Sequence, residues 1–256
     1  KYTILTPFCF RMPPLSLSAL ALDIKAIAPP KNLHAPVYER IHEMILDGRL
    51  LPGDRIDEEA FSKALRVSRT PLREALHRLD QEGLASIQPR RGAFVADFTK
   101  AQILDLLELR ETLEGFAARL ASERGDQAAL ARLREFAQTA DIVDARELIH
   151  ADRMFHQSVY EATGNLMLIE TSRRINDQVQ LVRLTTTLLG DRRIKSTDEI
   201  AGIVNAIGDR DADRAERLAR EHVRAAIAVV RTSFPDDATL SNVAHQMATL
   251  EGASQA

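Results

Sequence analysis

Residues 48–95 read GRLLPGDRIDEEAFSKALRVSRTPLREALHRLDQEGLASIQPRRGAFV, and this stretch decides the fold of the first part of the chain. Asp57 is a preferred helix-capping residue and precedes a short amphipathic run that ends at Leu65. Ser68 has the same capping chemistry and precedes a second amphipathic run, which Gly83 ends. The spacing therefore predicts two short helices joined by a tight link.

The flanks of this stretch supply one more helix and a hairpin. Pro36 suits the first turn of a helix, apolar residues then recur at helical spacing, and Gly48 is a helix stop. Residues 84–88 and 93–98 have strand character, and the letters RRG form the tip between them. Three helices followed by a hairpin predict a winged helix-turn-helix over residues 33–98.

The third predicted helix has two different faces. Arg69 and Arg73 lie four residues apart and therefore share one face. That face points away from the apolar stripe of the same helix, which consists of Leu72, Leu76 and Leu79. An arginine fork suits guanine because it can bond O6 and N7 together. The helix is therefore a candidate for reading the bases of DNA.

The local charge supports this interpretation without proving it. From residue 66 to residue 91 there are six arginines and three acids, in a chain whose formal net charge is −3. The arginines alone are equally well explained as a solvated face with Glu74 and Glu82 as partners. The turn, the helix stop and the wing tip favour DNA binding, because they occur together with the arginines.

The whole stretch resembles the GntR family of bacterial regulators, through its PG turn, its SRTPLREAL helix, its EGL stop and its PRRG wing tip. The resemblance implies that the third helix contacts bases and phosphates and that the wing tip enters the minor groove. The implied contact residues are Ser68, Arg69, Thr70 and Arg73 on the helix and Arg91 and Gly92 on the wing. In some family members a basic residue near the start of the second helix also touches DNA. Glu59 stands there in this chain, so that contact is not carried over.

The ends of the chain and its composition set the remaining limits. The single cysteine, Cys9, excludes a disulfide within the chain and fits a reducing, cytoplasmic compartment. No apolar run reaches the roughly 18 residues that a membrane helix needs, so we expect no membrane partner. Residues 1–32 are interpreted as an N-terminal extension, in part an expression or upstream-translation artefact. Residues 234–256 are expected to form a C-terminal tail.

The rest of the chain reads as one helix after another, separated by turns that contain glycine. The predicted helices cover 100–122, 126–139, 144–162, 166–189, 197–207 and 211–233. The usual cofactor and nucleophile signatures are absent, so we expect that the protein is not an enzyme. The chain is thus predicted to be mainly α, with a helical effector-binding and dimerisation bundle over residues 100–233.

Four polar residues stand where the helical pattern calls for apolar ones. Arg110 lies in the inner stripe of its helix and needs an anion, which is either Glu114 or the carboxylate of a ligand. Asp152 and His156 lie four residues apart on an inner face, and His222 faces inward from the last helix. One carboxylate and two imidazoles in one bundle interior suit a divalent metal. Hydrogen-bonded core histidines are the alternative.

The segments LLELRETLEGFAARLA, HADRMFHQSVYEATGN and AIGDRDADRAERLAREHV resemble the effector-binding domain of the FadR subfamily, called FCD, over roughly residues 103–231. In that family the pocket often holds a metal bound by one aspartate and three histidines, and the metal helps to bind an organic acid. Six legible helices favour the shorter, VanR-like form of this domain.

The resemblance assigns roles to the inward polar residues. It implies that Asp152, His156 and His222 are three of the metal ligands, with zinc as the first candidate, and that Arg110 is the arginine of the effector pocket. Asn176 and Arg183, seven residues apart, are further candidates for the pocket lining.

The fourth ligand of the family pattern is missing from this chain. It should be a histidine 22 residues before His222, and Ile200 stands there. His150 is near Asp152 in sequence but points about 200° away from it on a helix, so it is a poor substitute. The site is therefore weakened, completed by an effector or water, or lost.

Taken together, the sequence predicts a sequence-specific DNA-binding transcriptional regulator. We expect a repressor that is released by a small carboxylate effector and that binds a palindromic double-stranded operator as a homodimer. Two alternatives stay open. One is a metal-dependent enzyme built on Asp152, His156 and His222, and the other is a DNA-binding protein without a ligand.

Overall fold

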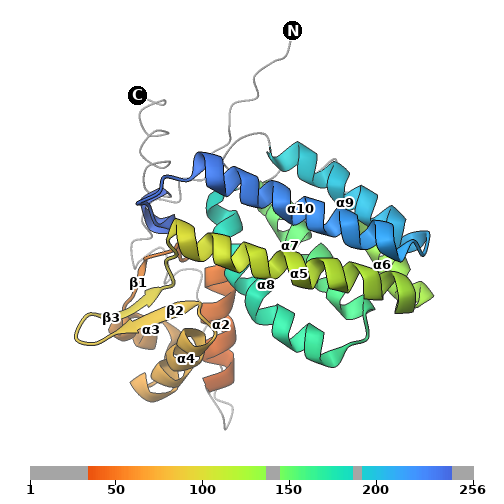
Figure 1. Ribbon diagram of the computed structural model, residues 1–256. Coiled ribbons are helices and arrows are strands. Elements are labelled where there is room, and N and C mark those ends of the chain that lie inside the picture. The colour runs from red at the N-terminus through yellow and green to blue at the C-terminus, as the bar shows by residue number, and fades with distance from the viewer. Residues whose placement is uncertain (1–33, 137–144, 187–191, 244–256) are drawn as a thin grey trace. The chain divides into compact units, whose positions relative to one another are not determined.

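The computed structural model (Figure 1) describes residues 34–136, 145–186 and 192–243. The N-terminal extension of residues 1–32 and the last part of the expected tail, residues 244–256, lie outside the described residues. The ends of two predicted helices, residues 137–139 and 187–189, also lie outside them. The fold is therefore described for the rest of the chain only.

The first compact unit contains the described residues 34–98 together with residues 239–243. Its elements are α2 (His34–Leu46), β1 (Arg55–Ile56), α3 (Glu58–Leu65), α4 (Arg69–Gln81), β2 (Ala85–Gln88) and β3 (Gly92–Val95). The three strands form an antiparallel sheet in the order β1-β3-β2. This is the winged helix-turn-helix that the sequence predicts.

Strand β1 is an element of this unit that the sequence analysis does not predict. Its residue Arg55 pairs with Phe94 of β3, and Ile56 pairs with Ala93. Two residues are too few to show the alternation from which strands are recognised. The alternation is nevertheless present, because Ile56 is buried and Arg55 is exposed.

Helix α4 is oriented by its apolar stripe. Leu72, Leu76 and Leu79 are each at most 1% exposed, whereas Arg69 and Arg73 are exposed. Burying one leucine stabilises a fold by roughly 1.5–3 kcal/mol, so three of them set which side of the helix faces the core. The arginines consequently lie on the outer side, as predicted.

The two predicted helix caps differ in their outcome. The side chain of Asp57 accepts hydrogen bonds from the backbone N–H groups of Glu59 and Ala60, which confirms it as the cap of α3. Ser68 occupies the capping position of α4, as predicted, but its side chain makes no capping hydrogen bond. A cap bonds the N–H of the second or third helical residue, and the third is Pro71, which has no N–H.

Residues 239–243 return to the first unit after the last helix of the second. The backbone N–H of Leu240, which is fully buried, donates to the carbonyl oxygen of Phe98. The backbone N–H and the hydroxyl of Ser241 both donate to the carboxylate of Asp97. Gly53, with a φ of +81°, leaves room for Ser241, because a Cβ at Gly53 would lie 2.8 Å from the Cβ of Ser241. Part of the expected tail thus belongs to the winged-helix unit.

The second compact unit contains residues 99–238. Its helices are α5 (Lys100–Arg124), α6 (Gln127–Phe136), α7 (Ala145–Ala162), α8 (Leu166–Thr186), α9 (Arg192–Gly208) and α10 (Ala212–Ser233). Each of the six predicted helices is found. Helix α9 begins five residues before the predicted start at Thr197, because no glycine or proline interrupts the chain between those points.

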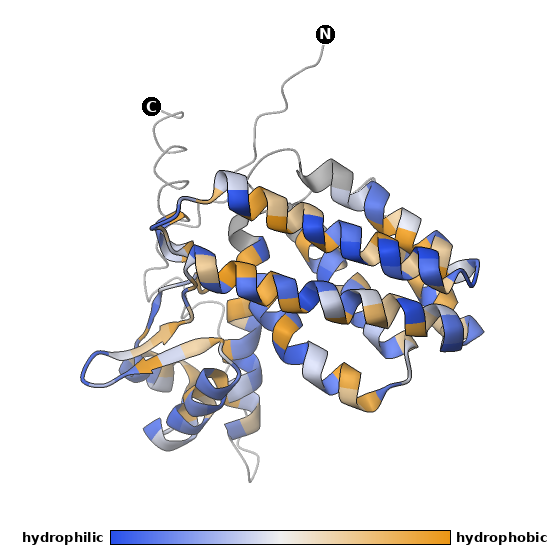
Figure 2. Cartoon of the chain, viewed as in Figure 1, coloured by the Kyte–Doolittle hydropathy of each residue, from blue (hydrophilic) through white to orange (hydrophobic). Residues whose placement is uncertain are grey.

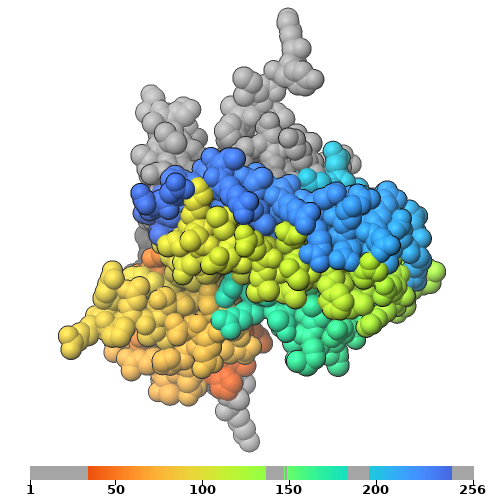
Figure 3. Space-filling view, viewed as in Figure 1, coloured from red at the N-terminus to blue at the C-terminus, as the bar shows by residue number. Residues whose placement is uncertain are grey.

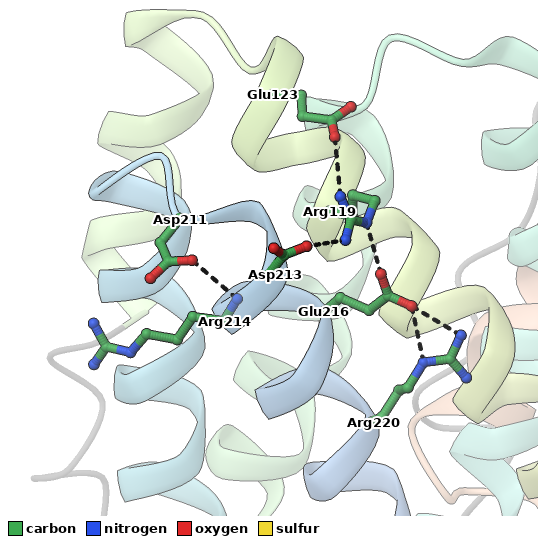
Figure 4. Close-up of polar contacts among 7 residues, drawn as sticks. All are labelled: Arg119, Glu123, Asp211, Asp213, Arg214, Glu216 and Arg220. Atoms are coloured by element: carbon green, nitrogen blue, oxygen red, sulfur yellow. Dashed lines mark hydrogen bonds and ion pairs between the residues drawn. The ribbon is translucent and has the colours of Figure 1, made fainter.

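Helices α5 and α10 lie side by side on the face of this unit that Figure 3 shows. Arg119 of α5 bonds Asp213 and Glu216 of α10, and Glu216 also accepts two hydrogen bonds from Arg220 (Figure 4). Gly115 of α5 permits this close approach, because a Cβ there would lie 2.7 Å from the side chain of Arg220. Exposed ion pairs contribute about 0–1 kcal/mol each, so the apolar contacts beneath them hold the two helices together.

The inner faces of the helices form one apolar core. Both α5 and α10 carry hydrophilic and hydrophobic residues in alternation along their length (Figure 2). Buried residues of α10 include Ala215, Ala219, Val223 and Ile227, and His222 lies within the same inner stripe. The stripe thereby directs an imidazole into the bundle. Within the described residues no helix is long and apolar enough to cross a membrane.

Candidate functional site

The outer end of α4 presents the helix residues that are expected to contact DNA. Ser68, Arg69, Thr70 and Arg73 are all exposed. The hydroxyl of Ser68 makes no capping hydrogen bond, and it lies beside the first backbone N–H groups of α4. Such a helix start attracts phosphate, because several N–H groups there lack an intrahelical acceptor. The first turn therefore combines hydroxyls, guanidinium groups and backbone donors on one surface.

The wing tip places a second basic group on the first unit. Arg90 and Gly92 both have positive φ values, 65° and 103°, which make the tight turn between β2 and β3. The guanidinium of Arg91 lies 5.6 Å from the ring centre of Phe94, and Arg91 is exposed. The side chain of Arg55 lies beside Gly92, since a Cβ there would be 3.7 Å from Nε of Arg55. Sequence reasoning missed Arg55, because only the pairing of β1 with β3 brings it to the wing.

Arg69 and Arg73 of α4 each bond an acid of α3. Nη2 of Arg69 lies 3.1 Å from Oε2 of Glu59, and Nε of Arg73 donates to Oε2 of Glu58 over 2.7 Å. The sequence analysis considered Glu74 and Glu82 as partners of the arginines. Glu82 is confirmed as a partner of one of them, because it accepts from Arg78, and it also accepts from the hydroxyl of Tyr38. Arg69 and Arg73 bond the acids of α3 instead.

The bundle of the second unit brings the three predicted metal ligands together. Asp152, His156 and His222 each offer one ligand atom, and these atoms lie within 4.8 Å of one another. The two imidazole rings have their centres 5.3 Å apart. His156 is fully buried and His222 is 4% exposed. Helices α7 and α10 thus supply one carboxylate and two imidazoles to one interior point.

Each histidine is held by a glutamate through its Nδ1 atom. Nδ1 of His156 lies 2.6 Å from Oε2 of Glu114, and Nδ1 of His222 lies 2.8 Å from Oε2 of Glu199. A carboxylate at Nδ1 favours the tautomer that carries its proton there, which leaves the lone pair on Nε2. Metal-binding histidines are typically oriented in this way by an acid behind the ring.

The orphaned Nε2 atom of His156 tests whether a metal fits. This atom is buried and has no hydrogen-bond partner, and Oδ1 of Asp152 is 3.6 Å away. A buried polar atom without a partner is costly and rare in a stable fold. A cation bound to Nε2 would satisfy it, so the donor set fits a divalent metal, with nitrogen and oxygen ligands that suit zinc.

Two buried arginines lie around the same point. Nε of Arg110 donates to Glu114 over 2.8 Å, which confirms the internal partner as one anion for this arginine. Nε of Arg183 pairs with Oδ2 of Asp152 over 2.5 Å. Yet Nη2 of Arg110 and Nη2 of Arg183 are both buried without a partner. The interior therefore still offers guanidinium donors to an anion.

Asn176 lies with these arginines in the interior. It is 6% exposed, its Oδ1 atom is buried without a partner, and its Nδ2 atom makes one long hydrogen bond to the backbone of Arg153. The structure thus places Arg110, Arg183 and Asn176 in the interior of the second unit.

Electrostatics keep the acids of this interior ionised. Burial opposes ionisation of Glu114, but attraction to His156 and Arg110 outweighs it and holds the pKa of Glu114 below its usual range. Burial likewise opposes ionisation of Asp152, but attraction to Arg183 together with His156 outweighs it, so the pKa of Asp152 is also lowered. Burial lowers the pKa of His222, although the hydrogen bond that His222 donates to Glu199 acts to raise it. Carboxylates that are charged and an imidazole that favours its neutral form are the states that bind metal.

The position of the missing histidine is filled by core packing. Ile200 is 5% exposed and belongs to the apolar cluster of the bundle. Its neighbour Glu199 reaches His222, a role that the family pattern did not suggest, because it depends on the turn of α9 beside α10. His150 is exposed, in agreement with the prediction that it points away from Asp152.

Comparison with known proteins agrees with both units. Residues 33–95 match the bacterial regulatory proteins of the gntR family, and residues 105–225 match the FCD domain. The Nta operon transcriptional regulator of Aminobacter aminovorans is 33% identical over 176 residues, which cover 68% of this chain and 82% of that protein. The HTH-type transcriptional repressor RspR of Escherichia coli is 24% identical over 200 residues, which cover 77% and 88%.

Two solved structures share the fold. The E. coli protein McbR/YncC aligns with a TM-score of 0.69 at 23% identity, over 79% of this chain and 99% of that chain. The structure of a Rhodococcus sp. RHA1 protein that was assigned to the GntR regulators aligns with the same TM-score at 22% identity and the same coverage. From its two matched segments and its resemblance to a known regulator along two thirds of its length, the chain belongs to the GntR family of DNA-binding transcriptional regulators, in the group that carries an FCD domain.

Proposed function

We propose that this regulator is a repressor that dissociates from its operator when it binds a small carboxylate. The carboxylate binds together with a divalent metal inside the helical unit. The metal ligands are Asp152, His156 and His222. Arg110, Arg183 and Asn176 bind the carboxylate. The reading head consists of α4 and the wing tip. The proposal extends the family assignment to particular atoms of this chain.

The observation that carries the proposal is a group of buried polar atoms without partners. Nε2 of His156 can donate its lone pair to a cation. Nη2 of Arg110 and Nη2 of Arg183 can donate hydrogen bonds to an anion. A metal and a carboxylate satisfy both demands at once, and the carboxylate can occupy the coordination position that Ile200 leaves without a ligand. Neither an apolar ligand nor a metal alone accounts for the unpaired guanidinium groups.

The protein and the metal have separate tasks at this site. The metal supplies a positive charge that attracts an oxygen of the ligand. Glu114 and Glu199 orient the two histidines, and Arg183 holds Asp152 through one of its oxygens. The forks of the arginines then select a planar carboxylate, because they can donate two parallel hydrogen bonds to it.

On DNA, we propose that the protein acts as a homodimer with two reading heads. Two-fold symmetry of the protein matches a palindromic operator, with one α4 in the major groove of each half-site. The carboxylate releases DNA only if it binds the DNA-free arrangement of the heads more tightly than the DNA-bound one. Its affinity should therefore be lower for protein that is bound to operator, by the same factor by which it weakens operator binding.

A thermal-shift experiment on zinc-loaded protein tests the effector proposal. The probes are acetate, lactate, succinate, citrate and benzoate. At least one is expected to raise the unfolding midpoint by about 5–10 °C at saturating concentration, since a ligand at a hundred times its Kd stabilises by about 2.7 kcal/mol. The same compound should weaken binding to an operator that the protein has selected from random duplex DNA.

Two matched substitutions localise that effect. Arg110→Lys keeps the buried positive charge beside Glu114 but loses the fork, so the midpoint shift should disappear. Arg174→Lys makes the same change at an exposed position of α8 and should preserve it. No shift with any probe would favour a DNA-binding protein without a ligand. Turnover of a probe by wild-type protein, abolished in His156→Ala, would favour the metal-dependent enzyme.

A further inference from the structure

The first turn of α3 carries two acids directly beside Arg69 and Arg73 of α4, the helix that is expected to read DNA. Oε2 of Glu58 accepts a hydrogen bond from Nε of Arg73 over 2.7 Å, and Oε2 of Glu59 lies 3.1 Å from Nη2 of Arg69. The cap Asp57 bonds the N–H of Glu59 and so fixes the start of the helix that carries both acids. Both arginines of α4 that are expected to meet DNA, Arg69 and Arg73, are therefore already bonded to a carboxylate.

The two pairs use different atoms of the guanidinium group. Glu58 bonds the inner nitrogen of Arg73, so both terminal nitrogens have no protein partner among the described residues. Those two nitrogens are the ones that can meet O6 and N7 of a guanine end-on. The bond to Glu58 consequently remains compatible with base contact and holds the plane of the guanidinium in one direction.

The pair between Arg69 and Glu59 has the opposite consequence. Glu59 bonds a terminal nitrogen, which a base or a phosphate would otherwise use. The side chain of Glu59 is 82% exposed, whereas that of Glu58 is 30% exposed. The side chain of Glu59 is thus loosely held. Its ion pair with Arg69 must break before both terminal nitrogens of Arg69 can bind DNA.

Stability does not explain these pairs. Both arginines are more than half exposed, and ion pairs in such positions contribute little to the free energy of folding. Acids near the DNA surface also repel phosphates, which lowers the affinity for any sequence. An acid near DNA can nevertheless improve recognition of the operator. It does so if it changes the affinity for the operator and the affinity for other sequences by different factors.

We propose that the acidic first turn of α3 tunes DNA binding in two ways: Glu58 is a positioning residue for Arg73 and sets selectivity, whereas Glu59 competes with DNA for Arg69 and sets overall affinity. This proposal rests on the contact of α4 with DNA. Glu58 favours the operator, because it restricts the rotamers of Arg73 before binding and lowers the entropy that is lost on binding. Glu59 weakens binding to every sequence, because its carboxylate must be displaced each time.

The test compares Glu58→Gln, Glu59→Gln and Glu74→Gln, each in the full-length protein. Glu74 is an exposed acid of α4 that bonds neither arginine, so it controls for the loss of one negative charge. Affinities are measured by fluorescence anisotropy over a series of salt concentrations, for a duplex selected by the wild-type protein and for its scrambled version. Urea unfolding of each variant verifies the fold.

Glu58→Gln is expected to lower the ratio of specific to non-specific affinity by about tenfold or more. Glu59→Gln should raise affinity for both duplexes by about threefold to tenfold, with a steeper salt dependence and an almost unchanged ratio. In an Arg73→Lys background, Glu58→Gln should have no further effect on the ratio, because lysine has no Nε–H to be held. Glu74→Gln should change both affinities slightly.

The proposal is overturned if Glu58→Gln and Glu59→Gln behave like Glu74→Gln, or if Glu58→Gln lowers the ratio equally in the Arg73→Lys background. Arg69→Ala serves as the reference arm. If that substitution weakens operator binding while the glutamate variants match Glu74→Gln, α4 is the helix that reads DNA and the proposed role of the acids is wrong. If it leaves operator binding unchanged, the reading helix itself is wrong.

Discussion

Arg69→Ala is expected to weaken binding to the selected operator by about 30-fold to 10⁴-fold, with little change in the free energy of unfolding. A bidentate arginine–base contact discriminates by about 1–3 kcal/mol, and the proposed homodimer would lose one such contact in each half-site. The fold should persist because Arg69 is exposed and its one ion pair, with Glu59, contributes about 0–1 kcal/mol. Gel shift and urea unfolding measure the two quantities.

A charge-matched control separates base reading from general attraction. Arg132→Ala removes an exposed arginine of α6, in the helical unit, and should leave operator affinity within about twofold of wild type. Arg69→Ala should also reduce the preference for operator over scrambled duplex, which the loss of a phosphate contact alone would not do. Unchanged gel-shift affinity would show that α4 does not read the operator.

His156→Ala is expected to lower the bound divalent metal from about one per chain to less than about a tenth, since two side-chain ligands rarely retain zinc. Nε2 of His156 is buried without a hydrogen-bond partner, so it is the strongest candidate among the three ligand atoms for binding a cation. Zinc should raise the unfolding midpoint of wild-type protein and leave that of the variant unchanged. Elemental analysis and thermal unfolding give both readouts.

His150→Ala is the matched control for this prediction. It removes an exposed imidazole from the same helix, α7, and should retain the metal. Asp152→Asn provides a second variant in case the cavity left by His156→Ala destabilises the bundle, because it keeps the shape of the side chain and removes only its charge. A metal content that stays at the wild-type value in both interior variants would exclude these residues as ligands.

The parts of the molecule that follow from local pattern were predictable from the sequence. The leucine stripe of α4 determines which side faces the core, so the exposure of Arg69 and Arg73 follows from spacing. The inward placement of His156 and His222 follows from the same periodicity. Ser68 was correctly predicted at the capping position, but its side chain makes no capping hydrogen bond, and Pro71 lacks one of the two N–H groups that a cap can bond.

The parts that depend on contacts distant in sequence were not predictable. Arg55 reaches the wing only because a two-residue strand pairs with β3, and Glu199 reaches His222 only because α9 packs on α10. The pairs between α3 and α4 are a similar case, since sequence spacing does not show which acid meets which arginine. Residues far apart in the chain meet through tertiary packing, which periodicity within one helix does not report.

The central claim is that the helical unit binds a divalent metal on three side chains although Ile200 stands in the position of the fourth. The most direct test is the metal content of the wild-type protein, measured by elemental analysis after dialysis against metal-free buffer and again after addition of one equivalent of zinc. The account predicts about one divalent ion per chain in the second measurement, retained on further dialysis. Protein that holds no metal before or after the addition would contradict it.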